Sequence, residues 1–260
     1  WAFTTSNSVK SSSEYRVQTF AWASYHFFGE GGYPLPDSHT FIHETGHILG
    51  LDDYYSYSEN PDSPMGGLDM MDYNIGDHCA FSKYLLKWID PRYVVKEGTY
   101  TLKNFQKYGD AIILATNYNG TPFCEYLILE YYSPDGLNYL DSHYSYSMSS
   151  YPKMFSKSGL RILHVDARLG YLKIRNEITW NGKYILEPEY YYYLGKTLGF
   201  IANNTPDYTL SDNKSDNLVE LVSRNRNDSD FYQGLLSNHA TYQDLYETGT
   251  SFSNTYELND

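Results

Sequence analysis

The sequence predicts an α+β protein in two parts, a helix-bearing part at residues 1–91 and a β-rich, sandwich-like part at residues 92–260. Two observations support this division. Before Pro91, the segments 39–49 and 78–89 have the residue types and spacing of helices. After Pro91, short runs of β-branched and aromatic residues alternate with turn-forming segments, which is typical of a β-sandwich or an antiparallel sheet.

Length and composition narrow the class of protein. The 260 residues, 41% of them apolar, are enough for a full hydrophobic core. The net charge of −13 argues against nucleic-acid binding, which needs Lys and Arg to contact phosphates. No run of about 18 apolar residues could span a membrane. Cys79 and Cys124 could form one disulfide, but two cysteines make no disulfide framework.

The elements of the first part are grouped around one helix. Residues 1–35 favour short strands and loops because they combine β-branched and aromatic residues with Gly and Pro. Asp37 or Ser38 offers an N-cap for the helix at 39–49. Residues 51–77 are rich in Asp, Ser, Gly, Pro and Tyr, which predicts a long ordered loop, and such loops are usually functional.

The second part begins after the helix at 78–89, which the Asp90–Pro91 pair ends. Six later segments are rich in β-branched, aliphatic and aromatic residues and are separated by turn-rich stretches. We therefore expect strands at 93–105, 110–118, 123–132, 159–167, 183–194 and 217–225.

The segment HETGHILGLDD, residues 43–53, has the features of a zinc site. Positions four apart lie on one face of a helix, so His43 and His47 can present two imidazole nitrogens to one metal ion. Glu44 lies about 100° further round the helix, where it can reach a water at the metal rather than the metal itself. A His-Glu-x-x-His motif alone is a weak signal, since solvated helices also contain it by chance.

A catalytic zinc needs a third protein ligand, and the sequence offers one after the helix. Gly50 accepts the positive φ at which a helix ends and the chain reverses. Asp53, ten residues after His43, then falls where an extended zinc motif carries its third ligand. The alternatives are Asp52 as the ligand, with Asp53 supporting it, and the more distant Glu59.

The extended motif resembles that of the metzincin clan of zinc peptidases. The downstream segments LDMMDY and KYLLKWIDP more closely resemble the immune inhibitor A-like metallopeptidases, also called cowrins. Further similarity to that family lies in EYLILEYY, GLRILHVDA, NLVELVSRN and DSDFYQG, so the resemblance covers about residues 1–252. It implies a metzincin-like zinc catalytic module at 1–91, with the β-rich domain at 92–260 packed on it.

The resemblance also implies roles for individual residues. Met71 would form the Met-turn that supports the zinc site from below, with Met70 and then Met65 as alternatives. Tyr73, two residues after Met71, resembles a Tyr that lies near the zinc in some metzincins and can stabilise the oxyanion. Packing in the core is the competing explanation for these side chains. The implied cofactor is Zn²⁺, and Ca²⁺ is a second candidate because relatives often bind it.

The same resemblance implies a secreted bacterial zinc endopeptidase that acts on protein or peptide substrates. His43, His47 and Asp53 would hold the zinc, and Glu44 would act as general base. Family members carry a much longer segment before the zinc helix than the 42 residues found here. We therefore expect the module to be N-terminally incomplete and to associate with a missing segment of the same protein. The competing hypothesis is a Tyr-rich β-sandwich adhesion or binding module with a vestigial zinc site.

Other candidate sites favour structural roles. His164 and Asp166 alternate along one strand and could bind a metal, but a structural task is the better explanation. Glu125 and Glu130 fall on opposite faces of a strand, so they cannot form the acid pair of a glycoside hydrolase. His78 begins the second helix and is interpreted as a capping or packing residue. Candidate calcium-binding stretches lie at 62–77 and 207–216.

Overall fold

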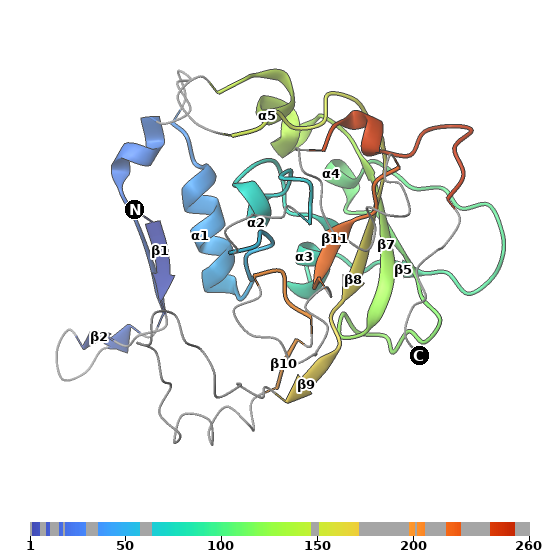
Figure 1. Cartoon of the computed structure of the whole chain (residues 1–260), viewed down its shortest axis with the longest axis horizontal. Helices are drawn as coiled ribbons and strands as arrows, with labels where there is room; N and C mark the ends of the chain where they lie inside the picture. Colours follow the sequence, from blue (N-terminus) through green and yellow to red (C-terminus); the bar gives the residue numbers. More distant parts are fainter. Residues whose placement is uncertain are drawn as a thin grey trace.

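A computed structural model describes the chain at residues 2–5, 9–10, 16–17, 19–29, 36–57, 64–146, 151–171, 198–200, 202–205, 217–224 and 240–252. These residues form an N-terminal hairpin, a central helix and a five-stranded mixed sheet (Figure 1). The predicted α+β class is therefore confirmed. In this described part of the chain, no helix is long and apolar enough to cross a membrane.

The N-terminal hairpin packs on the central helix. Strand β1 (Ala2–Thr5) pairs antiparallel with β4 (Phe20–Ala23), and the short strands β2 (Val9–Lys10) and β3 (Arg16–Val17) pair between them in sequence. A 3₁₀ turn, η1 (Tyr25–Gly29), follows β4. Figure 1 shows helix α1 (His39–Leu49) between this hairpin and helix α2 (Met70–Tyr73).

Helix α1 has the bounds that the sequence predicts. Its N-cap residue is Ser38, which makes no side-chain capping bond. Asp37 supplies the bond instead, because its Oδ1 accepts the backbone N–H of His39 at 3.0 Å. The helix ends at Gly50, whose φ of 98° lies in the left-handed region that glycine adopts without strain.

The predicted long loop at 51–77 is only partly irregular, because its end contains helix α2. Asp69 caps this helix: its side chain accepts the N–H of Met71 at 2.9 Å. The next helix, α3 (Ala80–Leu85), is shorter than predicted. Lys87 has a positive φ of 58° and ends helical geometry before Asp90. Trp88 is therefore 54% exposed and does not share the buried face of the helix.

The sheet has the strand order β11-β8-β7-β6-β5, and its neighbours are antiparallel except for the parallel pair β5–β6. The strands are β5 (Arg92–Tyr93), β6 (Ala111–Leu114), β7 (Glu125–Tyr132), β8 (Gly159–Asp166) and β11 (Val219–Leu221). Four of the six predicted segments thus contain a complete strand of this sheet, namely those at 110–118, 123–132, 159–167 and 217–225.

The two remaining strand predictions are not confirmed by the structure. The segment 93–105 is mostly irregular and leads into helix α4 (Phe105–Tyr108), so the long strand predicted there is wrong. The predicted strand at 183–194 lies outside the described residues. A separate antiparallel pair, β9 (Leu169–Tyr171) and β10 (Leu198–Phe200), was not predicted. The other short elements are η2 (Gly136–Asn138), α5 (Tyr139–His143) and η3 (Tyr242–Asp244).

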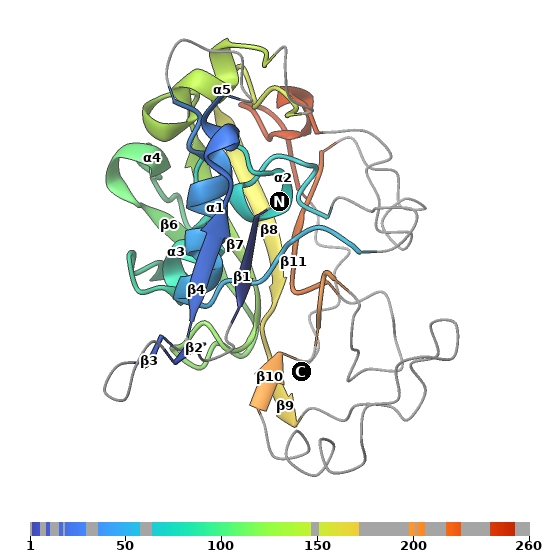
Figure 2. The same ribbon diagram turned by 90° about the vertical axis from the view of Figure 1, so that its left-hand side faces the viewer.

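The main hydrophobic core lies between the helices and one face of the sheet. Alternate side chains of β7, such as Tyr126, Ile128 and Tyr132, join buried residues of α2 and α3 in one cluster. The intervening side chains, such as Leu127, form a smaller cluster on the other face with Ile162 and Val222. Figure 2 looks from the hairpin side and shows β4 and α1 in front of the sheet.

The main core contains buried residues from both sides of residue 91, for example Phe81 before it and Phe105 after it. The domain boundary at this position stays a prediction. The β-sandwich also stays a prediction, because the only sheets among the described residues after 91 are the five-stranded sheet and the β9–β10 pair.

A buried ion pair fastens the sheet to the helices. Glu130 and Arg161 are cross-strand neighbours with 0% and 2% exposed side chains, and their charged atoms lie 2.5 Å apart. Glu130 Oε2 also accepts the N–H of Ala80 at 2.7 Å, at the first turn of α3. Arg161 Nη1 donates to the carbonyl of Leu68, just before α2. The pair therefore fixes both helices against the centre of the sheet.

Candidate metal centre

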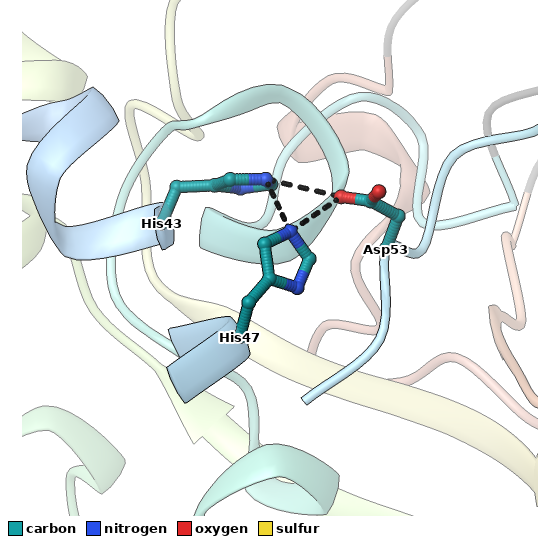
Figure 3. A group of neighbouring side chains, drawn as sticks. All are labelled: His43, His47 and Asp53. Carbon is teal, nitrogen blue, oxygen red and sulfur yellow. Dashed lines mark hydrogen bonds and ion pairs between the residues drawn. The ribbon is translucent and has the colours of Figure 1, made fainter. Parts of the chain in front are cut away.

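The two histidines of α1 and the aspartate after it converge on one point (Figure 3). His43 Nε2 lies 3.0 Å from Asp53 Oδ1, and His47 Nε2 lies 3.2 Å from the same oxygen. The two Nε2 atoms are 3.1 Å apart. His43 and Asp53 are buried, and His47 is half-buried. In the described part of the chain, this is the one group of three or more such side chains whose ligand atoms meet.

Backbone carbonyls orient both imidazole rings. His43 Nδ1 lies 2.8 Å from the carbonyl oxygen of Met70, and His47 Nδ1 lies 2.8 Å from that of Leu51. A carbonyl can only accept, so each Nδ1 carries the proton. In a neutral ring, Nε2 then presents its lone pair toward Asp53. This is the outer hydrogen bond that metal-binding histidines usually have.

Among the described residues, the buried Asp53 Oδ1 finds no hydrogen bond of acceptable geometry, although two ring nitrogens lie within 3.2 Å of it. A buried carboxylate oxygen without a partner costs about 1–3 kcal/mol or more. A divalent cation among the three atoms would satisfy this oxygen and both Nε2 lone pairs together. Two imidazoles and one carboxylate, with room for a water, are the ligand set of catalytic zinc.

The charges of the group suit a cation. Burial tends to raise the pKa of Asp53, but the close contacts with His43 and His47 and the hydrogen bond from Tyr57 outweigh burial and hold this pKa well below its usual range. Burial lowers the pKa of His47, yet the adjacent negative charge of Asp53 raises it overall. Asp53 is thus ionised at neutral pH, and a proton on His47 would compete with a metal ion for the same lone pair.

Glu44 lies beside the group and is held by the hairpin. Its side chain is buried, and the Thr4 hydroxyl of β1 lies 2.9 Å from both Glu44 Oε2 and the Glu44 carbonyl oxygen. One hydroxyl proton can serve either acceptor, so Thr4 fixes the carboxylate relative to the helix backbone. The negative charge of Glu44 contributes to the raised pKa of His47. Glu44 therefore lies within electrostatic range of the proposed metal ligands.

Met71 packs under the helix face that carries both histidines. It is fully buried, and a Cβ atom added to Gly46 would lie 2.6 Å from its sulfur. Gly46 follows His43 by three, so it lies beside His43 on the helix surface. A larger residue at this position would force the end of the Met71 side chain to move. This placement fits the Met-turn expectation, while Met70 contributes its carbonyl to His43 and Met65 lies in the main core.

Asp69 organises the turn that carries Met71. It is fully buried, and its Oδ2 accepts the N–H of Cys79 at 3.0 Å while its Oδ1 caps α2. One carboxylate therefore joins the starts of α2 and α3. Tyr54, directly after Asp53, donates its N–H to the Met71 carbonyl at 2.8 Å, which ties the ligand loop to the same turn.

Two tyrosines that the sequence analysis did not single out, Tyr55 and Tyr57, contact the ligand group, and the role of Tyr73 stays a prediction. Tyr73 is partly buried and packs against the main core. The Tyr57 hydroxyl donates to Asp53 Oδ2, and the Tyr55 ring lies 6.4 Å from the His43 ring. Burial and the charge of Asp53 raise the pKa of Tyr55, so this hydroxyl keeps its proton. Sequence reasoning missed both residues. Their position two and four residues after a proposed ligand was the available signal.

Neither alternative third ligand is found in the converging group of the described residues. Asp52 is exposed and does not belong to the converging group. Glu59 lies outside the described residues. Cys79 and Cys124, which could have paired, are both buried free thiols.

The other sequence candidates have structural partners. His164 Nε2 lies 3.0 Å from Glu125 Oε1, and Asp166 pairs with Arg168 at 2.7 Å, so both strand residues take part in ion pairs. His78 is buried and packs edge-on against the Trp88 ring.

The calcium expectation stays a prediction. In the stretch 62–77, Asp69 accepts two backbone N–H groups, Asp72 accepts the N–H of Gly67, and Asp77 pairs with Lys83. Residues 62–63 and 207–216 lie outside the described part of the chain.

Comparison of the chain with protein-family models, with curated proteins and with solved structures gave no match in any of the three. The functional argument therefore rests on the geometry of the side chains themselves.

Proposed function

We propose that this protein is a zinc-dependent endopeptidase, similar to the immune inhibitor A-like metallopeptidases of the metzincin clan, and that it is exported by a bacterium. One observation carries the proposal. His43 Nε2, His47 Nε2 and Asp53 Oδ1 lie 3.0–3.2 Å apart, both Nδ1 atoms are bound to backbone carbonyls, and a buried glutamate follows the first histidine.

The residues would divide the reaction as follows. His43, His47 and Asp53 would hold the zinc, which when bound supplies a Lewis acid that makes a nearby water acidic and polarises the scissile carbonyl. Glu44 would take a proton from the attacking water and give it to the leaving amine. Thr4 keeps the Glu44 carboxylate in place for both transfers.

Metal content tests the centre directly. We expect about one zinc per chain for the purified protein by mass spectrometry, as a single three-ligand site requires. The variants His47→Ala and Asp53→Ala should lose the metal, because each removes one of three ligands. His143→Ala, an exposed histidine on α5, is the matched control and should retain it. Zinc retained in both ligand variants would contradict the assigned site.

The role of Glu44 needs a separate variant. Glu44→Gln should retain zinc and lose cleavage of a denatured protein substrate by at least about a hundredfold, the size expected for loss of a general base. Glu97→Gln removes the same charge at an exposed position and should leave cleavage unchanged. Unchanged cleavage by Glu44→Gln would refute its role. A chain that binds zinc but cleaves no substrate would favour the competing binding-module hypothesis.

A further inference from the structure

A cavity of about 230 Å³ lies beside the N-terminal turn of α1. It is enclosed by that turn, by the segment after α2 and by the segment containing η2 and α5, which lies next to the start of α1 in Figure 1. One water occupies roughly 30 Å³ in the liquid, so the cavity has room for a long side chain. The assigned metal ligands do not line it.

The cavity nevertheless adjoins the metal centre. Ile42 lines it and directly precedes the ligand His43. His39 also lines the cavity, and it lies about one helical turn, or about 6 Å along the helix axis, before His43. Met70 also lines it, and the Met70 carbonyl is the group that orients His43. A peptide held at the metal centre could therefore place a neighbouring side chain in this cavity.

One wall of the cavity carries an excess of negative charge. His39 Nδ1 lies 2.5 Å from Asp37 Oδ1, and His39 Nε2 lies 2.9 Å from Asp141 Oδ1. Burial lowers the pKa of His39, but its bonds to Asp141 and Asp37 outweigh burial and raise it to about 9. A single imidazolium thus serves two carboxylates at neutral pH. The third carboxylate of the wall, Asp77, is paired with Lys83.

The uncompensated charge coincides with an unpartnered atom. Asp141 accepts from His39, from the N–H of Gly76 and from the Tyr146 hydroxyl. Only 7% of Asp37 is exposed, and its Oδ2 has no hydrogen-bond partner among the residues that the structure describes. Buried polar atoms are nearly always hydrogen-bonded, so this oxygen is available to a donor on a bound molecule.

The rest of the lining is apolar. Hydrophobic side chains and glycines make up much of the wall, namely Pro36, Ile42, Met70, Leu137 and Leu140 with Gly76 and Gly136. A metal ion does not fit this arrangement, because the two nitrogens of His39 face different carboxylates and the ligand atoms do not converge. A methylene stem with a cationic tip does fit, since the stem covers the apolar wall and the tip meets the carboxylate.

We propose that this cavity is a recognition pocket for a lysine or arginine side chain, with Asp37 as the carboxylate that meets the cationic tip. The inference rests on the proposed function only in treating that side chain as part of a peptide substrate. Apolar side chains and ionised acidic side chains have no donor for the Asp37 oxygen, and neutral polar side chains would leave its charge uncompensated, so all of these would be disfavoured.

Binding of a small cation tests the pocket without any cleavage. N-butylguanidinium and N-butylurea have nearly the same shape, but only the first is charged. In calorimetric or NMR titrations of the full chain, we expect N-butylguanidinium to bind about tenfold more tightly or better, which corresponds to one well-placed charged contact. The comparison requires no variant, so it stands even if a substitution prevents folding. Equal affinity of the two probes would overturn the pocket.

Asp37→Asn tests the assigned carboxylate. Asparagine keeps an Oδ1 acceptor for the backbone N–H of His39 but removes the charge. The ratio of the affinities for N-butylguanidinium and N-butylurea should therefore fall to about one. Asp90→Asn makes the same change at an exposed carboxylate outside the cavity and should retain the preference. A preference that persists in Asp37→Asn would overturn the assignment of Asp37.

Peptide cleavage separates this inference from the proposed function. Peptides that differ only in lysine or norleucine at each position around the scissile bond would be compared by kcat/KM. We expect lysine to be favoured about tenfold at one position, and Asp37→Asn to remove that ratio. Cleavage with no basic preference at any position would contradict the pocket and leave the peptidase intact. Charge-selective binding of N-butylguanidinium without cleavage of any peptide would support the pocket and contradict the peptidase.

Discussion

Thr4 and Glu44 lie forty residues apart in sequence, yet the Thr4 hydroxyl is 2.9 Å from the Glu44 carboxylate. A hydrogen bond to a charged group contributes about 1.5–3 kcal/mol, and this one links the hairpin to the proposed general base. The hydrogen bonds of the Thr4 hydroxyl go to Glu44, which is not one of the three converging residues. The contribution of Thr4 should therefore appear in proton transfer rather than in metal binding.

We predict that Thr4→Val lowers kcat about tenfold, which corresponds to about 1.4 kcal/mol, and changes KM less than about twofold. Thr4→Ser keeps the hydroxyl and should restore most of kcat. Both variants should bind zinc like the parent chain. Thr45→Val, which removes an exposed hydroxyl from the same helix, is the matched control. A loss of zinc in Thr4→Val, or no rescue by serine, would refute a positioning role.

At the scale of elements, the buried Glu130–Arg161 pair joins the sheet to the helices. Removing one partner of a buried pair leaves the other charge without compensation, which costs about 3–5 kcal/mol. Glu130→Ala should lower the free energy of unfolding by about this amount in denaturant titrations. It also removes the acceptor of the Ala80 N–H at the start of α3.

A double substitution distinguishes the unpaired charge from lost packing. Glu130→Leu combined with Arg161→Met removes both charges and should recover part of the stability that Glu130→Ala loses. Arg92→Ala breaks an exposed pair with Asp110 and should cost less than about 1 kcal/mol. A double variant that is no more stable than Glu130→Ala would show that the pair contributes by its own attraction and not only by mutual compensation.

The same elements show how far the sequence predicts the fold. Helix α1 and the central strands β6, β7 and β8 have strong local patterns, and the structure confirms them. Helix α2 was not predicted because four residues carry no measurable periodicity. It forms because Asp69, a buried side chain, caps it and joins it to α3. That is a tertiary effect which local pattern cannot show.

The sequence likewise predicts one part of the candidate site and not the other. The spacing of His43, His47 and Asp53 predicted a common ligand group, and the structure brings the three together. Thr4 could not be predicted because its contact with Glu44 depends on how the hairpin packs on α1. The cavity beside α1 could not be predicted either, since Asp37 and Asp141 come from segments about a hundred residues apart in the printed sequence.

At the scale of the whole molecule, two half-buried histidines, each between two carboxylates, couple the stability of the fold to pH. Burial lowers the pKa of His164, but its bonds to Glu125 and Glu220 outweigh burial and raise it to about 9. Burial also lowers the pKa of His39, but its bonds to Asp141 and Asp37 outweigh burial and raise this pKa to about 9. One histidine lies in the sheet and the other at the start of α1, so the two effects are independent contributions to one folding equilibrium.

The sign follows from the folded and unfolded values. Each folded pKa lies above the unfolded value of about 6.5, so the protonated imidazole stabilises the folded state. This contribution is fully present below about pH 6.5 and is lost as the pH rises through about 9. With about 1.4 kcal/mol for each pKa unit, the loss is on the order of 3 kcal/mol at most for each histidine.

We therefore predict that the free energy of unfolding falls between pH 6.5 and pH 9 in urea titrations. His164→Gln should flatten this fall by removing one of the two contributions, and the decline that remains should be that of His39. Glu125→Gln should flatten it as well, because it removes the carboxylate that accepts from His164. Since the net charge of −13 grows more negative with pH, general repulsion could also produce a decline. Repulsion would persist in both variants, so an unchanged slope in both would assign the decline to it rather than to His164.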